Sequence, residues 1–237
     1  MKKKRTKDVI MSVVLVLSIV LLCFTGIGCG EEEHKVNIRY LQTIPYREEV
    51  GNVSENFLAD TFYAFRTKWN MLFTHSVANI NDNYISACPT ASLNSICTCS
   101  KNCTNSTSTF YHHTNSGKML NAFSNSISDS NYDIFVILTA AKLCLINDST
   151  NIHSNDIAGL AFLKGDWAIC NLSPKSSEII NGRVIQHELS HLYGCNEGVC
   201  SGEKLCIMSG GYDETALLST NDIWCSNCEN SFKVSLH

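Results

Sequence analysis

The two histidines of the segment His187-Glu-Leu-Ser-His191 could bind a metal ion. They are four residues apart, so in a helix their imidazole rings lie on one face and point to one place. Two imidazole nitrogens at about 2.0–2.1 Å from one ion supply half of a tetrahedral zinc site. The spacing therefore predicts that His187 and His191 are ligands of one zinc ion.

Glu188 follows the first histidine directly and lies about 100° around the helix from it. At that angle the carboxylate is not placed as a third ligand, but it can hydrogen-bond a water molecule at the metal. A carboxylate in this place can take a proton from that water as a general base. The motif therefore predicts metal-assisted hydrolysis with Glu188 as the catalytic residue.

The residues after the second histidine carry a resemblance to a known family. Gly194 can adopt a left-handed conformation and turn the chain sharply, so that a residue about three positions later returns to the metal. The segment from His187 to Gly194, followed by Cys206-Ile-Met208, resembles the metzincin zinc endopeptidases. In that family a methionine turn lies beneath the metal. Met208 matches this methionine, 17 residues after His191.

The resemblance also implies a third zinc ligand, three residues after the glycine. Metzincins usually have histidine there, whereas this chain has Glu197, in Gly194-Cys-Asn-Glu197. A carboxylate can bind zinc at about 2.0–2.2 Å, so Glu197 is the expected ligand. Cys195, or no protein ligand at all, are the alternatives. A carboxylate adds one negative charge relative to histidine and should reduce the Lewis acidity of the ion.

Four cysteines surround the expected methionine turn and the region of the last helix. Their arrangement resembles that of archaemetzincins, in which four cysteines hold a second, structural zinc. The same cysteines could instead form disulfides that stabilise the C-terminal region, as an exported protein would favour. Both interpretations remain open at this stage. The four residues are Cys200, Cys206, Cys225 and Cys228.

A short apolar segment precedes the histidine helix. Residues 158–163, with Cys170 after them, resemble the edge strand of reprolysin-type metzincins. That resemblance implies that the segment binds substrate by adding a strand at the edge of the sheet. The metzincin-like features lie between residues 130 and 230, and the first half of the chain carries only a compatible order of elements.

The elements that must position these residues alternate along the chain, which indicates an α/β fold with a mixed sheet. The histidine helix is expected to begin near Ser177, shortly after Pro174, and to stop at Gly194. The resemblance implies a metzincin-like twisted sheet packed on helices, an active-site helix, and a small C-terminal subdomain with a methionine turn and a final helix. We expect strands at 36–43, 80–87, 133–138 (buried and central), 157–163 and 166–170, helices at 55–77, 115–127 and 177–193, and a disulfide-stapled loop at 88–107.

Residues 1–29 differ in character from the rest of the chain. Five cations followed by an apolar run at 9–28 are typical of a signal peptide or an uncleaved membrane anchor. The run ends Gly26-Ile-Gly-Cys29, which resembles a bacterial lipoprotein cleavage site and makes Cys29 a candidate for lipid attachment. Thirteen cysteines fit an oxidising compartment. We therefore expect an extracytoplasmic protein: a cell-surface lipoprotein, a membrane-anchored protein or a secreted one.

Residues 30–237 are expected to form a single metallopeptidase domain, with an upper subdomain at 30–194 and a cysteine-rich lower subdomain at 195–237. The chain has 18 Lys and Arg and 22 Asp and Glu. Five of these cations and one of these acids lie in residues 1–29, so the rest of the chain has 13 cations, 21 acids and a net charge of −8. Nucleic-acid binding needs a basic surface, so an acidic body argues against a nucleic-acid partner.

These observations predict a zinc-dependent peptidase that acts on peptides or proteins outside the cytoplasm, with one catalytic zinc and, if the four cysteines bind metal, a second structural one. The alternative is a catalytically inactive surface binding module stabilised by zinc or disulfides. The missing third histidine motivates that alternative. Glu188 argues against it, because a purely structural metal site has no need of this acid.

Overall fold

The computed structural model describes residues 33–80, 114–140, 143–147, 152–200, 206–209, 218–220 and 223–237. Residues 34–237 form one compact unit, distinct from residues 1–33. No helix in these described ranges is long and apolar enough to cross a membrane. The predicted anchor with Cys29, the strand at 80–87 after its first residue, and the loop at 88–107 lie outside the described residues.

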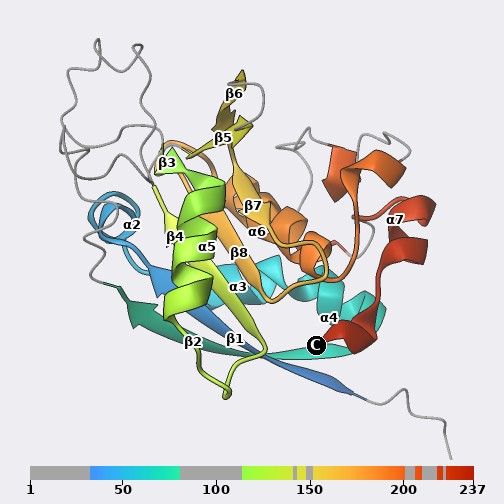
Figure 1. Cartoon of the computed structure of the whole chain (residues 1–237). Coiled ribbons are helices and arrows are strands. Elements are labelled where there is room, and N and C mark those ends of the chain that lie inside the picture. Colours follow the sequence, from blue (N-terminus) through green and yellow to red (C-terminus); the bar gives the residue numbers. More distant parts are fainter. Residues whose placement is uncertain are drawn as a thin grey trace, which may run out of the picture. The chain divides into compact units, whose positions relative to one another are not determined.

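The main sheet has five strands in the order β2-β1-β4-β8-β7 (Figure 1). The first four are parallel, and β7 pairs antiparallel with β8 at the edge. All six residues of β4 are buried, as its apolar sequence predicts for a central strand. The strands are β1 (His34–Gln42), β2 (Met71–Asn79), β4 (Ile134–Thr139), β7 (Gly159–Ala161) and β8 (Trp167–Asn171).

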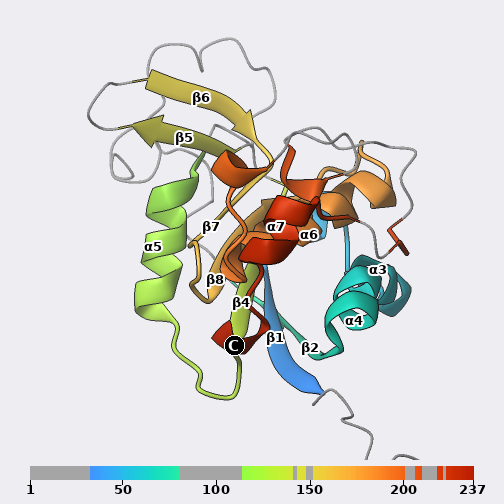
Figure 2. The same ribbon diagram turned by 90° about the vertical axis from the view of Figure 1, so that its right-hand side faces the viewer.

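Helices cover both faces of this sheet, which makes the fold a mixed α/β architecture, as expected. Phe135 and Ile137 of β4 pack in one core cluster with residues of α5, whereas Val136 and Leu138 pack in a second cluster with residues of α3, α4 and α6. Figure 2 shows α5 on one side of the strands and α3 and α4 on the other. The α-helices are α2 (Ile44–Glu49), α3 (Glu55–Thr61), α4 (Tyr63–Trp69), α5 (Ser116–Ser126), α6 (Glu178–Leu192) and α7 (Ser226–Ser231).

A smaller sheet precedes the edge strand. Its order is β3-β5-β6, and β6 is separated from β7 by a single residue, Ala158. These strands are β3 (Thr114–Asn115), β5 (Leu143–Asn147) and β6 (Ile152–Ile157). The strand predicted at 157–163 is therefore shorter than expected, and its first residue belongs to β6.

The long helix predicted for 55–77 is wrong beyond residue 69. The segment forms α3 and α4, which meet at Phe62, and then strand β2. Asn70 ends α4 in the left-handed conformation (φ 49°, ψ 39°), which asparagine tolerates better than most residues. After it, Met71 and Phe73 are buried while Leu72 is exposed, so the spacing of apolar residues changes to that of a strand.

Helix α6 begins and ends with strong local signals. The hydroxyl of Ser177 accepts a hydrogen bond from the backbone N–H of Ile180, and Glu178 lies in the first turn, where the helix dipole favours an acid. At the other end Gly194 has φ 97°. All residues from 181 to 190 are buried, because α6 packs against β7 and β8 on one side and against α3 and the C-terminal region on the other.

The C-terminal region folds back onto the N-terminal helices. Its short 3₁₀-helices are η2 (Glu197–Val199), η3 (Ile207–Ser209) and η4 (Val234–Leu236), and α7 precedes η4. Phe232 stacks on Trp69 of α4 at 4.7 Å between ring centroids and on Tyr193, just after α6, at 4.9 Å. This aromatic stack holds the C-terminal region against the end of the histidine helix.

Candidate metal centre

The structure brings together the three residues that were predicted to bind the catalytic zinc. The Nε2 atoms of His187 and His191 are 3.1 Å apart, and Oε1 of Glu197 lies 3.2 Å from Nε2 of His187. All three ligand atoms lie within 4.8 Å of one another. Bonds of about 2.0–2.1 Å to a tetrahedral ion place two ligand atoms about 3.3 Å apart, so the observed spacing fits one zinc ion.

Glu197 reaches the histidines because the chain reverses after α6. Gly194 turns the chain at φ 97°, a conformation that other residues adopt only with strain. The side chain of Asn196 then accepts a hydrogen bond from the N–H of Gly198 at 2.9 Å and caps η2, of which Glu197 is the first residue. The turn at Gly194 was predicted from the sequence, but the cap formed by Asn196 was not. An Asn two residues before a Gly is nevertheless a recognisable turn signal.

Cys195, the alternative third ligand, is directed elsewhere. Its buried thiol donates a hydrogen bond to the carbonyl oxygen of Cys228 at 3.3 Å. The backbone carbonyl of Cys195, however, accepts a hydrogen bond from Nδ1 of His191 at 2.9 Å. The structure therefore places the side chain of Glu197, and the backbone of Cys195, beside the histidines.

Both imidazole rings are oriented by backbone carbonyls. Nδ1 of His187 lies 2.8 Å from the carbonyl oxygen of Ile207, which is the counterpart of the bond between His191 and Cys195. A carbonyl oxygen can only accept, so each Nδ1 carries a proton, and in the neutral imidazole Nε2 then keeps its lone pair. This is the tautomer that a metal ion requires on Nε2. The sequence did not identify these two carbonyls.

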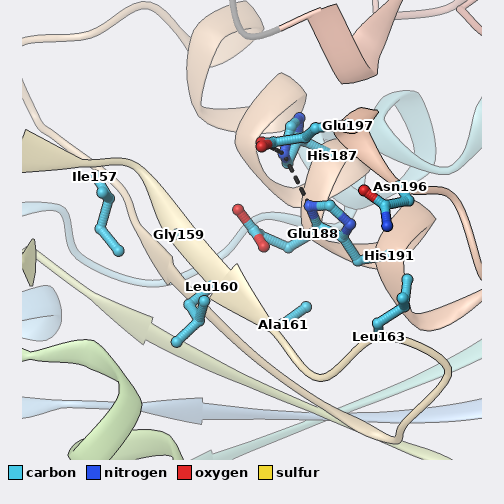
Figure 3. A pocket seen from close by; sticks show the side chains of 10 residues that line it. All are labelled: Ile157, Gly159, Leu160, Ala161, Leu163, His187, Glu188, His191, Asn196 and Glu197. Atoms are coloured by element: carbon cyan, nitrogen blue, oxygen red, sulfur yellow. Dashed lines mark hydrogen bonds and ion pairs between the residues drawn. The ribbon is translucent and has the colours of Figure 1, made fainter. Parts of the chain in front are cut away.

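Glu188 lies beside the two histidines at the wall of a cleft. The cleft has a volume of about 330 Å³ and is lined by β7, the end of α6 and the segment before η2. Figure 3 shows the carboxylate between strand β7 and the histidine rings. Glu188 is only 3% exposed, and its Oε2 has no hydrogen-bond partner among the described residues. A buried carboxylate at the wall of a cleft is positioned to accept a proton from a bound molecule.

The charges of the site influence one another. Burial raises the pKa of Glu188 to about 7, opposed by His187 and assisted by Glu197. The pKa of His187 is raised: burial lowers it, but the hydrogen bond to Glu197 and the charge of Glu188 outweigh burial. Burial and the neighbouring His187 lower the pKa of His191, while the hydrogen bond from His187 lowers that of Glu197. Two carboxylates that repel each other beside two imidazoles are stabilised by a bound cation.

Met208 lies in η3, which packs against α6, and is 1% exposed. It follows Ile207, the residue whose carbonyl orients His187. The structure therefore places the predicted methionine in a buried turn that contacts the histidine helix, within the same core cluster as Val184 and Ile185 of α6.

The four C-terminal cysteines also converge. The sulfur atoms of Cys206 and Cys228 are 3.7 Å apart and those of Cys200 and Cys225 are 4.0 Å apart. All four sulfur atoms lie within 4.8 Å of one another as free thiols. Zinc–sulfur bonds of about 2.3 Å in a tetrahedral site place sulfur atoms about 3.8 Å apart, whereas a disulfide requires about 2.0 Å. The arrangement thus fits a four-thiolate zinc site better than two disulfides.

Without a cation, Cys206 and Cys228 resist ionisation. Burial raises the pKa of Cys206 to about 11 and also raises that of Cys228, and neighbouring thiols contribute to both shifts. Four thiolates that repel one another in a buried place need a bound cation to be stable. The chemistry of this set of ligands therefore agrees with its geometry.

Comparisons with known proteins give likenesses of fold only. No protein-family model matches the chain, and no curated protein matches its sequence. Among solved structures, archaemetzincin from Methanopyrus kandleri is similar with a TM-score of 0.49 and 14% identity, over 85% of this chain and 95% of that one. Metalloproteinase-II from Bacteroides fragilis is similar with a TM-score of 0.41 and 9% identity, over 85% of this chain and 54% of that one. These identities are too low to transfer residue roles to this chain.

Proposed function

We propose that this protein is a zinc-dependent peptidase of the metzincin type, in which His187, His191 and Glu197 bind the catalytic ion. The observation that supports this most strongly is the spacing of 3.1 and 3.2 Å between their ligand atoms, next to a buried carboxylate that borders an open cleft. A purely structural metal site has no need of either the cleft or the acid.

In this proposal Glu188 acts as general base and then as general acid. A bound zinc ion supplies Lewis acidity, which polarises the carbonyl of the peptide bond and acidifies water. The Glu188 carboxylate accepts the proton of the attacking water and then donates it to the leaving amine. His187 and His191 keep their orientation during these steps because their Nδ1–H groups donate to backbone carbonyls.

We further propose that the substrate peptide lies along β7. This strand is the last of the main sheet, and no strand among the described residues pairs with its outer edge. An extended peptide can add to such an edge through main-chain hydrogen bonds. Leu160, Ala161 and Leu163 line the cleft together with Glu188 and Glu197, so apolar side chains should be preferred and acidic ones disfavoured.

A second, structural zinc at Cys200, Cys206, Cys225 and Cys228 belongs to the same proposal. We also propose an extracytoplasmic location and the membrane as a partner. Residues 1–29 would act as a signal peptide, a membrane anchor or, through Cys29, a lipid anchor. A zinc ion bound to all four thiolates would protect them from oxidation in such a compartment, since thiolate chemistry requires access to the sulfur. We propose no nucleic-acid partner, in keeping with the acidic body.

The decisive experiment compares the wild-type protein with Glu188→Gln. Both should bind zinc at the histidine site, but only the wild type should cleave a casein or mixed-peptide substrate, with turnover abolished by a chelator and restored by zinc. Glutamine has nearly the shape of glutamate and cannot accept the proton, so its effect separates catalysis from folding. Equal cleavage by both proteins contradicts the role of Glu188. Zinc binding without any cleavage by the wild type favours the alternative, an inactive binding module.

A further inference from the structure

Strand β7 passes unusually close to the catalytic carboxylate. A Cβ atom placed on Gly159 would lie 2.5 Å from Oε1, 2.6 Å from Cγ and 2.7 Å from Cδ of Glu188. Real Cβ atoms essentially never approach another atom within 3.0 Å. Figure 3 shows Gly159 on the strand that faces the carboxylate across this gap. Any side chain at position 159 therefore requires Glu188 or the strand to move.

The glycine is needed for space and not for an unusual backbone conformation. Among the described glycines, only Gly51 and Gly194 have a positive φ angle. The backbone of Gly159 is therefore accessible to alanine, and glycine in a strand otherwise weakens it. The local backbone conformation therefore does not require glycine at this position, whereas the close approach of Glu188 does.

The strand cannot easily retreat from the carboxylate. Gly159 and Ala161 pair with Cys170 and Ala168 of β8, and the N–H of Asn171 donates to the carbonyl of Ala158 at 2.7 Å. Moving β7 outward would break these hydrogen bonds at the edge of the sheet. A methyl group at position 159 would thus be accommodated by a displacement of the Glu188 side chain.

Such a displacement would move the Glu188 carboxylate away from Gly159, toward the histidines or the cleft that it lines. The backbone of Glu188 lies inside the buried part of α6, and its side chain has Gly159 on one side and the histidines on another. We propose that Gly159 is a positioning residue, whose missing side chain gives the Glu188 carboxylate its place beside the metal ligands. This inference rests on the proposed peptidase function, because the position matters for catalysis only if Glu188 is the base.

The first test is kinetic. Gly159→Ala should lower kcat about 100-fold, the order of loss expected when a catalytic group is misplaced by about 1 Å. The KM value and the zinc content should stay close to those of the wild type. In Glu188→Asp the carboxylate is retracted by one methylene, so the added methyl of Gly159→Ala should change kcat of that variant by less than about threefold. A Gly159→Ala variant with wild-type kcat, or the same fold loss in both backgrounds, overturns the proposal.

The second test needs neither activity nor bound metal. Unfolding midpoints in denaturant are measured for the metal-free wild type, Gly159→Ala, Glu188→Ala and the double variant. The methyl group should lower the midpoint when Glu188 is present and leave it unchanged or slightly raised when residue 188 is alanine, because the clash is then absent. Equal decreases in both backgrounds overturn the close contact. A wild type that cleaves no substrate refutes the peptidase function, while this cycle still decides whether Gly159 positions Glu188.

Discussion

The imidazole of His191 and the backbone carbonyl of Cys195 form a hydrogen bond of 2.9 Å, which links the two candidate metal-binding clusters of this protein. The thiol of Cys195 in turn donates to the carbonyl of Cys228, a member of the four-cysteine cluster. One residue therefore orients a histidine of the first cluster through its carbonyl and contacts the second cluster through its side chain.

His187 is linked to the four cysteines in a similar way. Its Nδ1 donates to the carbonyl of Ile207, whose neighbour in the chain, Cys206, belongs to the cluster. The N–H of Ile207 donates to the carbonyl of Ile223 at 2.7 Å, so hydrogen bonds fix both the N–H and the carbonyl of Ile207. The cysteine cluster is thus connected to the backbone acceptors of both histidines.

We expect the loss of one cysteine of the cluster to weaken zinc binding at the histidines. Cys228→Ser should lower the zinc affinity of the histidine site about 10–100-fold, the usual effect of disturbing groups that orient ligands. Competition with a chromogenic chelator measures this affinity. Cys170→Ala is the matched control, because Cys170 is equally buried but lies in β8 and should leave the affinity unchanged. The same affinity in both variants would mean that the two clusters are independent.

Replacement of Glu197 tests the third ligand. Glu197→Ala should lower zinc affinity more than the Cys228 variant does, because a ligand is lost and not merely its support. Glu197→His should retain binding, since histidine supplies a neutral ligand. The side chain of Glu197 is 63% exposed, so the free energy of unfolding of the metal-free protein should change by no more than about 0.5 kcal/mol. Tight stoichiometric zinc in Glu197→Ala, measured by atomic absorption after dialysis, would exclude Glu197 as a ligand.

His75 of β2 should make the protein less stable in mild acid. Burial, assisted by the charge of Arg66, lowers the pKa of His75 from 6.5 to about 4, and among the described residues the one polar contact of its ring is the hydroxyl of Tyr40. The unfolded chain binds this proton near pH 6.5 while the folded protein does not. The free energy of unfolding should therefore fall as the pH decreases from 6.5 to 4.

The contribution of His75 is isolated by comparing unfolding midpoints of the wild type and His75→Gln across that pH range. Glutamine retains a polar group near Tyr40 but does not titrate, so the variant should lose less stability than the wild type between pH 6.5 and pH 4. Identical pH profiles would contradict the lowered pKa. Subtracting one pH profile from the other cancels the contribution of the other histidines, because both proteins contain them.

The start of the histidine helix can be tested without touching the site. Ser177→Ala removes the hydroxyl that accepts from the N–H of Ile180 and should lower the free energy of unfolding by about 1 kcal/mol. Ser177→Asp retains a capping oxygen and should be close to the wild type. Chemical denaturation measures both, and an alanine variant as stable as the aspartate variant would show that the cap contributes nothing.

The features that could be predicted from sequence are those that depend on local rules. His187 and His191 converge because they are one helical turn apart, and the turn at Gly194 follows from the conformational freedom of glycine. The end of α4 at Asn70 was missed because the spacing of the aromatic residues before it suits a helix, while the change to a strand depends on burial in the sheet. The convergence of Glu197 was expected only from a resemblance.

Contacts between distant segments could not be predicted from periodicity at all. The carbonyls of Ile207 and Cys195 orient the histidines only after the chain has turned back on itself, and backbone atoms carry no sequence signal. Gly159 lies inside a segment whose sequence predicts a strand. The reason for this glycine, the approach of Glu188 from a helix 29 residues later, exists only in three dimensions.

The packing of the C-terminal region against α4 and Tyr193 has a consequence for the time at which the site forms. The N–H of Lys233 donates to the carbonyl of Tyr193 at 2.8 Å, and Phe232 stacks on the same tyrosine. During synthesis the ribosome releases residues 187–197 before residues 225–233, so a growing chain has its histidines but lacks the segments that hold them. We therefore expect the histidine site to reach its final geometry only after the residues of the aromatic stack have been synthesised.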